Sequence, residues 1–355
     1  MAAASPFLQA LEGKRPARTP VWFMRQAGRS LPEYRRLRAG KNMLDSCLDP
    51  ELAAEITAQP VRRHGVDAAV FFSDIMVPLK LAGVPVDIKP GVGPVMDKPY
   101  RNASDIWELV SHAPGDATVI TEAVRLAARK VDVPVLAFAG APFTLAAYLV
   151  EGGPSRDHLA ARALMHSAPQ SWRMLANWCA ELSLQFAKAQ IAGGAKAFQL
   201  FDSWAGSLSR ADYLRYCAPY SRKVLEGVRA LRIPTIHFGV GTGPLLIDFA
   251  EGATCVGVDY RTDLGEAITT LRKHGSPSPL VVQGNIDPAM LSCGSRLLDE
   301  HVDTILDAAK AADAHILNLG HGVPRQTDPH VLTRLVQRVH RLQEIQEGTW
   351  KLLKQ

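Results

Sequence analysis

The sequence predicts an α/β fold, a single (β/α)8 barrel of the TIM type with a β-hairpin inserted after the second strand. Eight short apolar runs recur along the chain, and each stops at a glycine or a polar residue. Continuous apolar runs are typical of parallel strands that are covered on both faces. Amphipathic segments such as 171–191 and 297–312 lie between the runs. A doubly wound sheet is the competing arrangement, and the count of eight favours the barrel.

The predicted strands follow one another in chain order. They are residues 20–24, 68–72, 134–138, 197–201, 234–238, 254–258, 280–283 and 315–319. After the second strand, the segment 81–99 is rich in Val, Gly and Pro and predicts the inserted hairpin. The gap between the fifth and sixth strands is too short for a full helix. Because no linker or low-complexity segment interrupts the pattern, residues 1–355 are interpreted as one barrel domain.

Composition indicates a globular cytoplasmic protein. With 47% hydrophobic and 21% charged residues, the chain is close to the average, which argues against disordered, collagen-like and disulfide-stabilised classes. Its five cysteines are odd in number and far apart, so we expect reduced, mostly structural thiols. The N-terminus does not resemble a secretory signal. The 18 uncharged residues 133–150 include Pro134, Gly140 and Pro142, so they predict a strand, a loop and a helix rather than a membrane span.

The charge of the chain is small but unevenly distributed. Its formal net charge of +5 is too low to indicate nucleic-acid binding. Between Lys14 and Arg63, however, eleven basic residues stand against five acidic ones, and we call residues 14–63 the basic arm. Such a cluster suits a polyanionic ligand, and a solvated helix face is the alternative interpretation. We expect the basic arm to contribute to the mouth of the active site.

Polar residues follow six of the eight predicted strands. In barrels of this type, the loops after the C-terminal ends of the strands carry the chemistry. These residues are Arg25–Arg29 after the first strand, Ser73-Asp74 after the second, Tyr148 beyond the third, Asp202-Ser203 after the fourth, Gly284-Asn285 after the seventh and Gly320-His321-Gly322 after the eighth. We therefore expect these groups to converge on one mouth.

These motifs, in this order, resemble the uroporphyrinogen decarboxylase family. The longest is Pro-Val-Trp-Phe-Met-Arg-Gln-Ala-Gly-Arg-Ser-Leu-Pro-Glu-Tyr at residues 20–34. Shorter blocks follow at 72–75, 138–145, 151–153, 199–203, 283–285 and 318–324, so the resemblance covers nearly the whole chain. It implies a (β/α)8 barrel that works as a homodimer without cofactor or metal. The implied reaction converts the four acetate side chains of uroporphyrinogen III to methyls, giving coproporphyrinogen III and CO2 in haem biosynthesis.

The resemblance also implies which residues act. The implied substrate-binding residues are Arg25, Gln26, Ala27, Gly28, Arg29, Asp74, Tyr148, Ser203 and His321. Among them, Asp74, Arg25, Tyr148 and His321 are the candidates for catalysis. Two positions depart from the family pattern. Trp204 follows the serine where some members have His, and Ala137 stands in the third strand where Gly is common.

The chemistry of the reaction agrees with these residue types. Loss of CO2 leaves a carbanion unless the pyrrole is first protonated and takes up the electrons. Asp74 could accept pyrrole N–H bonds and stabilise the cationic ring, whereas a helix N-cap is its alternative role. Arg25 and Arg29 are suited to carboxylates, and the basic arm as far as Arg38 could supply more cations.

The remaining polar groups have several possible roles. Tyr148 and Ser203 could orient a carboxylate, and Asp202 could orient Ser203 or an arginine. His321, between two glycines, could pair with an acetate or relay a proton. Arginine is a very weak acid, so the proton donor is left open.

Two other functions remain open. The first is a zinc-dependent corrinoid or coenzyme methyltransferase, because that group of enzymes is similar in fold. Such enzymes need thiolate ligands for the zinc, typically His-x-Cys with a further Cys. Here the corresponding stretch is His237-Phe-Gly239, and the later Cys255 and Cys293 form no obvious set. A tetrapyrrole-binding protein without activity is the other alternative. The glycines at 239, 241 and 243 lack the register of a nucleotide-binding motif.

Overall fold

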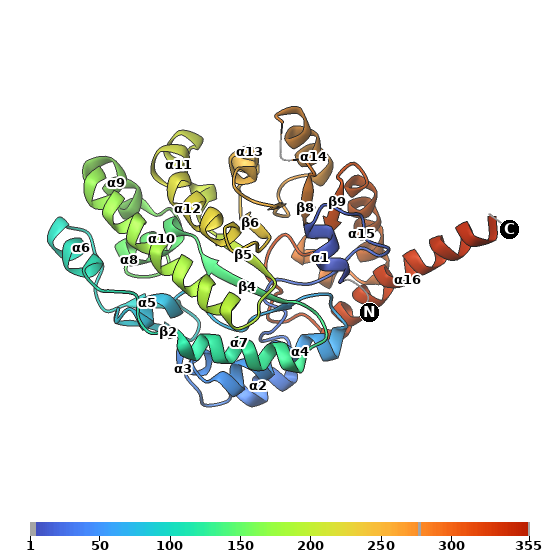
Figure 1. Cartoon of the computed structure of the whole chain (residues 1–355), viewed down its shortest axis with the longest axis horizontal. Coiled ribbons are helices and arrows are strands. Elements are labelled where there is room, and N and C mark those ends of the chain that lie inside the picture. The colour runs from blue at the N-terminus through green and yellow to red at the C-terminus, as the bar shows by residue number, and fades with distance from the viewer. Residues whose placement is uncertain (1–4, 276–277, 354–355) are drawn as a thin grey trace.

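The core of the molecule is a curled, parallel sheet of seven strands. The computed structural model describes residues 5–275 and 278–353. The strands lie in the order β1-β4-β5-β6-β7-β8-β9, and helices surround them (Figure 1). Their bounds are β1 Ala69–Val70, β4 Val135–Gly140, β5 Ala197–Asp202, β6 Thr235–Gly239, β7 Cys255–Gly257, β8 Val281–Gln283 and β9 Ala314–Ile316. Seven of the predicted apolar runs therefore form strands of one sheet.

The strands are apolar because both of their faces are covered. All six residues of β4 are buried, and Ala137 pairs with Phe198 of β5 in parallel register. Along β5, only Phe201 is partly exposed. A buried parallel sheet favours continuous apolar runs over alternating ones, which is why the runs were visible in the sequence.

The first predicted strand, residues 20–24, is the exception. Val21 makes only an isolated parallel bridge with Leu317, just after β9. The Leu317 N–H donates to the carbonyl of Pro20 at 2.9 Å, and the Asp67 N–H donates to the carbonyl of Val21 at 2.7 Å. The segment thus lies between β9 and the approach to β1. The Val21 N–H donates to the Asp67 carboxylate at 2.8 Å instead of to a strand carbonyl, so no regular ladder forms there.

A separate antiparallel pair lies in the segment 81–99. Strands β2 (Val86–Lys89) and β3 (Gly93–Met96) pair from Val86 with Met96 to Lys89 with Gly93. They are not part of the seven-stranded sheet.

The helices of the outer layer are uneven in length. Their bounds are α1 Pro6–Leu11, α2 Pro32–Arg38, α3 Met43–Cys47, α4 Pro50–His64, α5 Val77–Leu81, α6 Ala103–Val110, α7 Thr118–Lys130, α8 Pro142–Glu151, α9 Leu159–Ser167, α10 Pro169–Ala192, α11 Arg210–Tyr216, α12 Ala218–Arg229, α13 Leu246–Ala250, α14 Leu264–Lys273, α15 Ser295–Ala309 and α16 Pro329–Leu353. Helices α10 and α15 match the two predicted amphipathic segments. The short gap after β6 holds a single 3-10 turn, Gly243–Leu245, and the five-residue α13, so no full helix forms there, as the short gap predicted.

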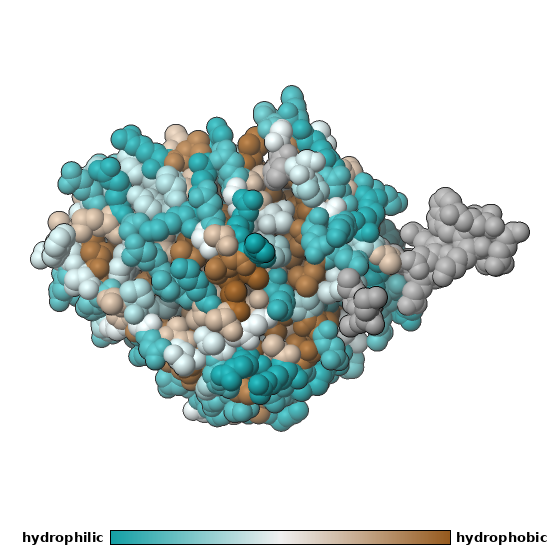
Figure 2. All heavy atoms as spheres, in the orientation of Figure 1, coloured by the Kyte–Doolittle hydropathy of each residue, from teal (hydrophilic) through white to brown (hydrophobic). Residues whose placement is uncertain are grey.

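The surface and the cysteines agree with the composition. Figure 2 shows hydrophilic residues spread over the viewed face, with small apolar areas between them. All five cysteines are free, and four of them are buried while Cys293 is exposed. Within the described residues, no helix is long and apolar enough to cross a membrane. The uncharged residues 133–150 form β4 and most of α8.

Candidate active site

The loop after residues 20–24 is held against the loop that follows β9. The Met24 N–H donates to Asn318 Oδ1 at 3.1 Å, and the Val323 N–H donates to the Met24 carbonyl at 2.8 Å. Arg25 follows with a φ of 62°, which is uncommon for a residue other than glycine. A Cβ on Gly322 would lie 2.6 Å from Arg25 Cδ, so the arginine side chain passes directly over this glycine. The structure therefore places Arg25 beside His321.

Gln26 has a structural role in the same loop. Its side chain is fully buried, its Oε1 accepts from the Phe23 N–H, and its Nε2 donates to the Ala68 carbonyl, both at 2.9 Å. These bonds fix the loop to the segment that leads into β1. The side chain has no free face toward a ligand, so the predicted substrate contact of Gln26 is restricted to its backbone.

The rest of this loop stays accessible. Ala27 and Gly28 are partly buried, and Arg25 and Arg29 are exposed. A Cβ on Gly28 would lie 2.8 Å from the Arg25 carbonyl oxygen, so glycine is needed for the turn. Within the described residues, neither arginine has a carboxylate partner. Their guanidinium groups are therefore free to bind an external anion.

Asp74 has one carboxylate oxygen engaged and one open. Its Oδ1 accepts from the Met76 N–H at 2.9 Å, at the start of α5. Its Oδ2 has no hydrogen-bond partner in the described part of the chain. Burial raises the pKa of Asp74, and the Met76 N–H and the Arg25 charge act in the opposite direction. One carboxylate oxygen thus orients the side chain while the other remains open to a ligand.

Tyr148 lies near both of these charged groups. Burial, together with the Asp74 charge, raises the pKa of Tyr148 to about 12, and the Arg25 charge acts in the opposite direction. The hydroxyl is therefore protonated at neutral pH, and it has no partner among the described residues. The Tyr148 ring packs on Trp204 with centroids 4.0 Å apart, and Trp204 packs on His158 at 4.3 Å. This stack orients Tyr148 as a hydrogen-bond donor.

His321 can act as a neutral hydrogen-bond donor. Its Nδ1 accepts from the Gly322 N–H at 2.8 Å, so the ring proton of the neutral form is on Nε2. Desolvation lowers the pKa of His321, and the charges of Arg25 and Arg261 lower it further. Because the surrounding positive charge disfavours an imidazolium, His321 would donate one hydrogen bond without carrying charge.

Ser203 and Asp202 are adjacent in the sequence, but their side chains have different surroundings. Ser203 is partly exposed, and its hydroxyl has no partner in the described part of the structure. Asp202 is fully buried, with its Oδ2 3.3 Å from Ser221 Oγ and 3.5 Å from His237 Nε2. His237 in turn stacks on Phe249 of α13, with centroids 3.8 Å apart. Asp202 therefore faces the helix layer, and the expectation that it orients Ser203 or an arginine is wrong.

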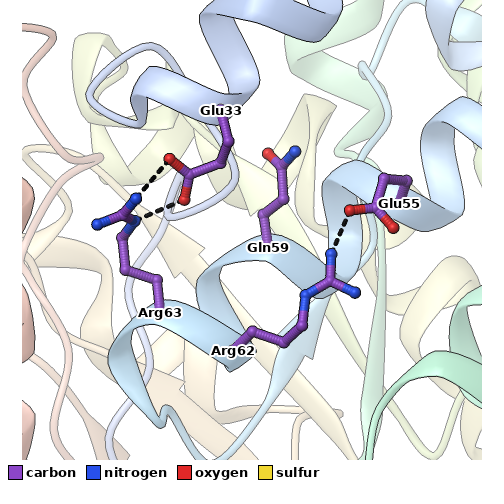
Figure 3. A pocket seen from close by; sticks show the side chains of 5 residues that line it. All are labelled: Glu33, Glu55, Gln59, Arg62 and Arg63. Carbon is purple, nitrogen blue, oxygen red and sulfur yellow. Dashed lines mark hydrogen bonds and ion pairs between the residues drawn. The ribbon is translucent and has the colours of Figure 1, made fainter.

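Much of the basic arm is already neutralised. Arg63 of α4 makes two bonds to the Glu33 carboxylate, at 2.5 and 2.8 Å, and Arg62 pairs with Glu55 (Figure 3). These four side chains and Gln59 line a pocket on the surface between α2 and α4. The pocket carries equal numbers of acidic and basic groups, so it has no preference for a polyanion.

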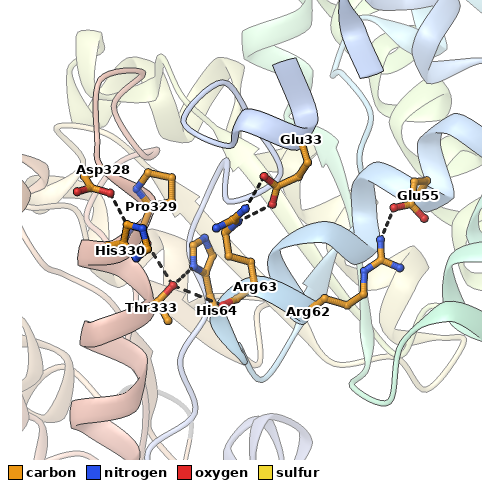
Figure 4. A network of polar contacts seen from close by, with 9 residues as sticks. All are labelled: Glu33, Glu55, Arg62, Arg63, His64, Asp328, Pro329, His330 and Thr333. Carbon is orange, nitrogen blue, oxygen red and sulfur yellow. Dashed lines mark hydrogen bonds and ion pairs between the residues drawn. The ribbon is translucent and has the colours of Figure 1, made fainter. Parts of the chain in front are cut away.

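The other end of this cluster links α4 to α16. The His64 Nδ1 lies 2.8 Å from Thr333 Oγ1, and the Thr333 hydroxyl is also within 3.4 Å of the Arg63 carbonyl (Figure 4). Burial lowers the pKa of His64 to about 4.

Two further arginines of the arm are also engaged. Arg18 pairs with Asp67 at 2.6 Å, and Arg38 donates to the backbone carbonyls of Lys41 and Asn42. The charges of these arginines thus stabilise the fold. The excess of basic residues in the arm is therefore a poor guide to which charges are available to a ligand.

The sequence interpretation missed Arg261. It is exposed in the loop after β7, and its charge acts on His321. Asp259 lies in the same loop, and its carboxylate accepts from the Gly241 N–H at 2.6 Å and from the Thr262 hydroxyl at 3.1 Å. The signal was present in the sequence, because Val258-Asp-Tyr-Arg261 follows a predicted strand as Arg25 does.

Comparison with known proteins shows the family to which the chain belongs. The family model described as "Uroporphyrinogen decarboxylase (URO-D)" matches residues 2–342. A uroporphyrinogen decarboxylase of Arthrobacter sp. (strain FB24) is 57% identical over 340 residues, covering 95% of this chain and 97% of that protein. One from Leifsonia xyli subsp. xyli (strain CTCB07) is 54% identical, covering 95% and 94%. The chain belongs to the uroporphyrinogen decarboxylase family.

Solved structures show the same fold at much lower identity. A methyltransferase from Methanosarcina mazei superimposes with a TM-score of 0.73 at 17% identity, covering 95% of this chain and 97% of that one. A B12-independent methionine synthase from Shewanella sp. W3-18-1 gives 0.53 at 12% identity, covering 82% and 88%. These likenesses concern the fold alone, and the family match does not favour the methyltransferase alternative. Within the described residues, no three His, Cys, Asp or Glu side chains are grouped as metal ligands.

Proposed function

We propose that this member of the uroporphyrinogen decarboxylase family converts uroporphyrinogen III to coproporphyrinogen III at the mouth that contains Asp74. The observation that carries the proposal is that Asp74 keeps one carboxylate oxygen open while Arg25 and Arg29, within the described residues, have no carboxylate partner. The substrate presents pyrrole N–H groups at its centre and carboxylates at its edge. The described residues offer matching groups, an acceptor oxygen at Asp74 and cations at Arg25 and Arg29.

Each decarboxylation needs an electron sink, which the substrate itself supplies. Protonation of the α-carbon next to the ring carbon that bears the acetate arm makes the pyrrole cationic and keeps the acetate-bearing carbon conjugated with it. The electron pair of the C–CO2 bond then moves into the ring, CO2 leaves, and protonation of the exposed methylene carbon gives the methyl group. Loss of the first proton restores the pyrrole. Asp74 would accept pyrrole N–H bonds and stabilise the cationic ring in a partly water-excluded site.

The other residues would bind and orient the substrate. Arg25 and Arg29 offer planar donors that match carboxylates. Tyr148, Ser203 and His321 offer neutral donors, and the backbone at Gln26, Ala27 and Gly28 completes the loop. Arg25, Tyr148 and His321 are the further candidates for catalysis, because the Arg25 charge acts on Asp74, Tyr148 and His321 alike. The proton donor is left open among them.

We also propose that residues 20–24 complete the seven-stranded sheet as the first strand of a closed (β/α)8 barrel. The bridge from Val21 to Leu317 and the bond from Asp67 to Val21 support this closure. The β2–β3 pair would then be an insertion after the second barrel strand. One barrel domain, a homodimer and a cytoplasmic location remain predictions from the sequence and the family resemblance. Light scattering of the purified protein would test the dimer.

Incubation with reduced uroporphyrinogen III in the absence of added metal tests the function. Chromatography of the oxidised products should show porphyrins with seven, six and five carboxyls, ending at coproporphyrin. Tight binding without these products would indicate a tetrapyrrole-binding protein. An absence of both binding and turnover would refute the proposal.

A further inference from the structure

The loop after β7 carries an arginine whose surroundings suggest a ligand. Arg261 is exposed, and within the described residues it has no carboxylate partner. The loop itself is anchored by Asp259, which is almost fully buried and accepts from the Gly241 N–H and the Thr262 hydroxyl. The neighbouring acid is therefore held by these bonds and forms no ion pair with Arg261, although its charge acts on the guanidinium group.

The guanidinium group of Arg261 is also positioned. Its central carbon lies 5.6 Å from the centroid of the Tyr260 ring, and its Nε is 3.4 Å from the Tyr260 hydroxyl. Its Nη1 would be 3.3 Å from a Cβ at Gly241, in the loop after β6. Holding a long side chain in place before binding reduces the entropy lost on binding.

The Arg261 loop packs against the loop of His321. A Cβ on Gly320 would lie 2.1 Å from the Tyr260 backbone nitrogen, so the two loops touch directly. The charges of Arg25 and Arg261 both act on His321, which places both arginines near the same imidazole. Arg25 also acts on Asp74 and Tyr148, whereas Arg261 is not among the described groups that do so. Arg261 thus belongs to the same mouth but lies farther from Asp74.

We propose that Arg261 binds a propionate carboxylate of the tetrapyrrole at the rim of the mouth and so contributes to substrate specificity. This inference rests on the proposed function. Four acetates must reach Asp74 in turn, and each is lost, whereas the four propionates persist through every round. A rim cation that serves all four rounds must bind a carboxylate that remains.

Steady-state kinetics of Arg261→Ala test the proposal with two substrates. Uroporphyrinogen III carries eight carboxylates, and the pentacarboxyl porphyrinogen carries one remaining acetate and the four propionates. For both substrates, the KM of Arg261→Ala should rise about tenfold while kcat changes little, because a charge-assisted contact made equally in ground and transition states is lost. Arg261→Lys, which keeps the charge but not the planar fork, should raise KM by only about threefold.

Arg215→Ala is the matched control. Arg215 is likewise exposed and lies over its neighbour Tyr216, with its guanidinium carbon 5.1 Å from the ring centroid, but on the outer helix α11. Its variant should keep the wild-type KM. An Arg261→Ala variant with the same KM as Arg215→Ala would overturn the inference. A penalty that disappears with the pentacarboxyl substrate would overturn it too, because Arg261 would then bind an acetate. Failure of the wild-type protein to turn over either substrate would instead count against the proposed function.

Discussion

The mouth of the sheet and helix α4 contain the same kinds of charged residue in opposite states. At the mouth, Arg25 and Arg29 have no carboxylate partner within the described residues, and Asp74 keeps one oxygen open. On α4, Arg62 and Arg63 are paired with Glu55 and Glu33. The difference shows that the number of arginines in a segment does not predict whether the segment binds an anionic ligand. What matters is whether the fold has brought a carboxylate to each of them.

The largest effect should follow from Asp74→Asn. Asparagine can still accept the Met76 N–H but loses the charge, so the fold should persist while kcat falls about 10²- to 10³-fold, as for other electrostatic contacts to a developing charge. Asp49→Asn is the matched control, because Asp49 caps α4 through the Leu52 N–H, at 3.1 Å, and lies in the arm. A wild-type kcat in Asp74→Asn would show that Asp74, like Asp49, acts only as a helix cap.

Acidification should destabilise the fold through His64, which links α4 to α16. The His64 pKa is about 4 in the folded protein and about 6.5 when unfolded, so the unfolded state binds more protons at low pH. The stabilisation is present above pH 6.5 and is lost as the pH falls toward 4, by roughly 2 kcal/mol at pH 5. Denaturant unfolding across this range should show the decline, and His64→Gln should flatten it. Equal slopes in the two proteins would show that His64 is not buried in its neutral form.

Arg29→Ala should mainly weaken substrate binding. Loss of a charge-assisted bond to a carboxylate is worth about 1.5 kcal/mol, or a KM raised by roughly tenfold, with little change in stability. Kinetics with uroporphyrinogen III and thermal unfolding would separate the two quantities. An unchanged KM would argue that Arg29 is only a solvated surface residue.

The smallest effect should follow from Arg63→Ala. This change removes the pair with Glu33, which is partly exposed, so the free energy of unfolding should fall by no more than about 1 kcal/mol. Turnover should be unchanged, because the pair lies outside the mouth. A large loss of turnover in Arg63→Ala, with stability kept, would contradict the distinction between α4 and the mouth.

The fold could be predicted to the extent that burial leaves a pattern in the sequence. Seven apolar runs form strands because both faces of the sheet are covered. Residues 20–24 have the same pattern, but the bond from Val21 to the Asp67 carboxylate replaces a ladder contact, and no pattern of apolar residues could show that. The length of α13 could be predicted because the chain between β6 and β7 is short.

The candidate site could be predicted from strand ends but not from side-chain pairing. Arg25, Asp74, Ser203 and His321 follow strands, and each was found for that reason. The pairing of Gln26 with Ala68 and of Asp202 with His237 depends on segments far apart in the chain, so the roles of these side chains required the structure. Arg261 follows a predicted strand by three residues and could have been found by the same rule.

A structure of the protein with bound coproporphyrinogen tests the central claim most directly. The account predicts pyrrole N–H groups within hydrogen-bond distance of Asp74 Oδ2, with the propionates at the arginines of the mouth. A ligand bound in the pocket between α2 and α4, or one whose pyrrole nitrogens lie away from Asp74, would contradict it.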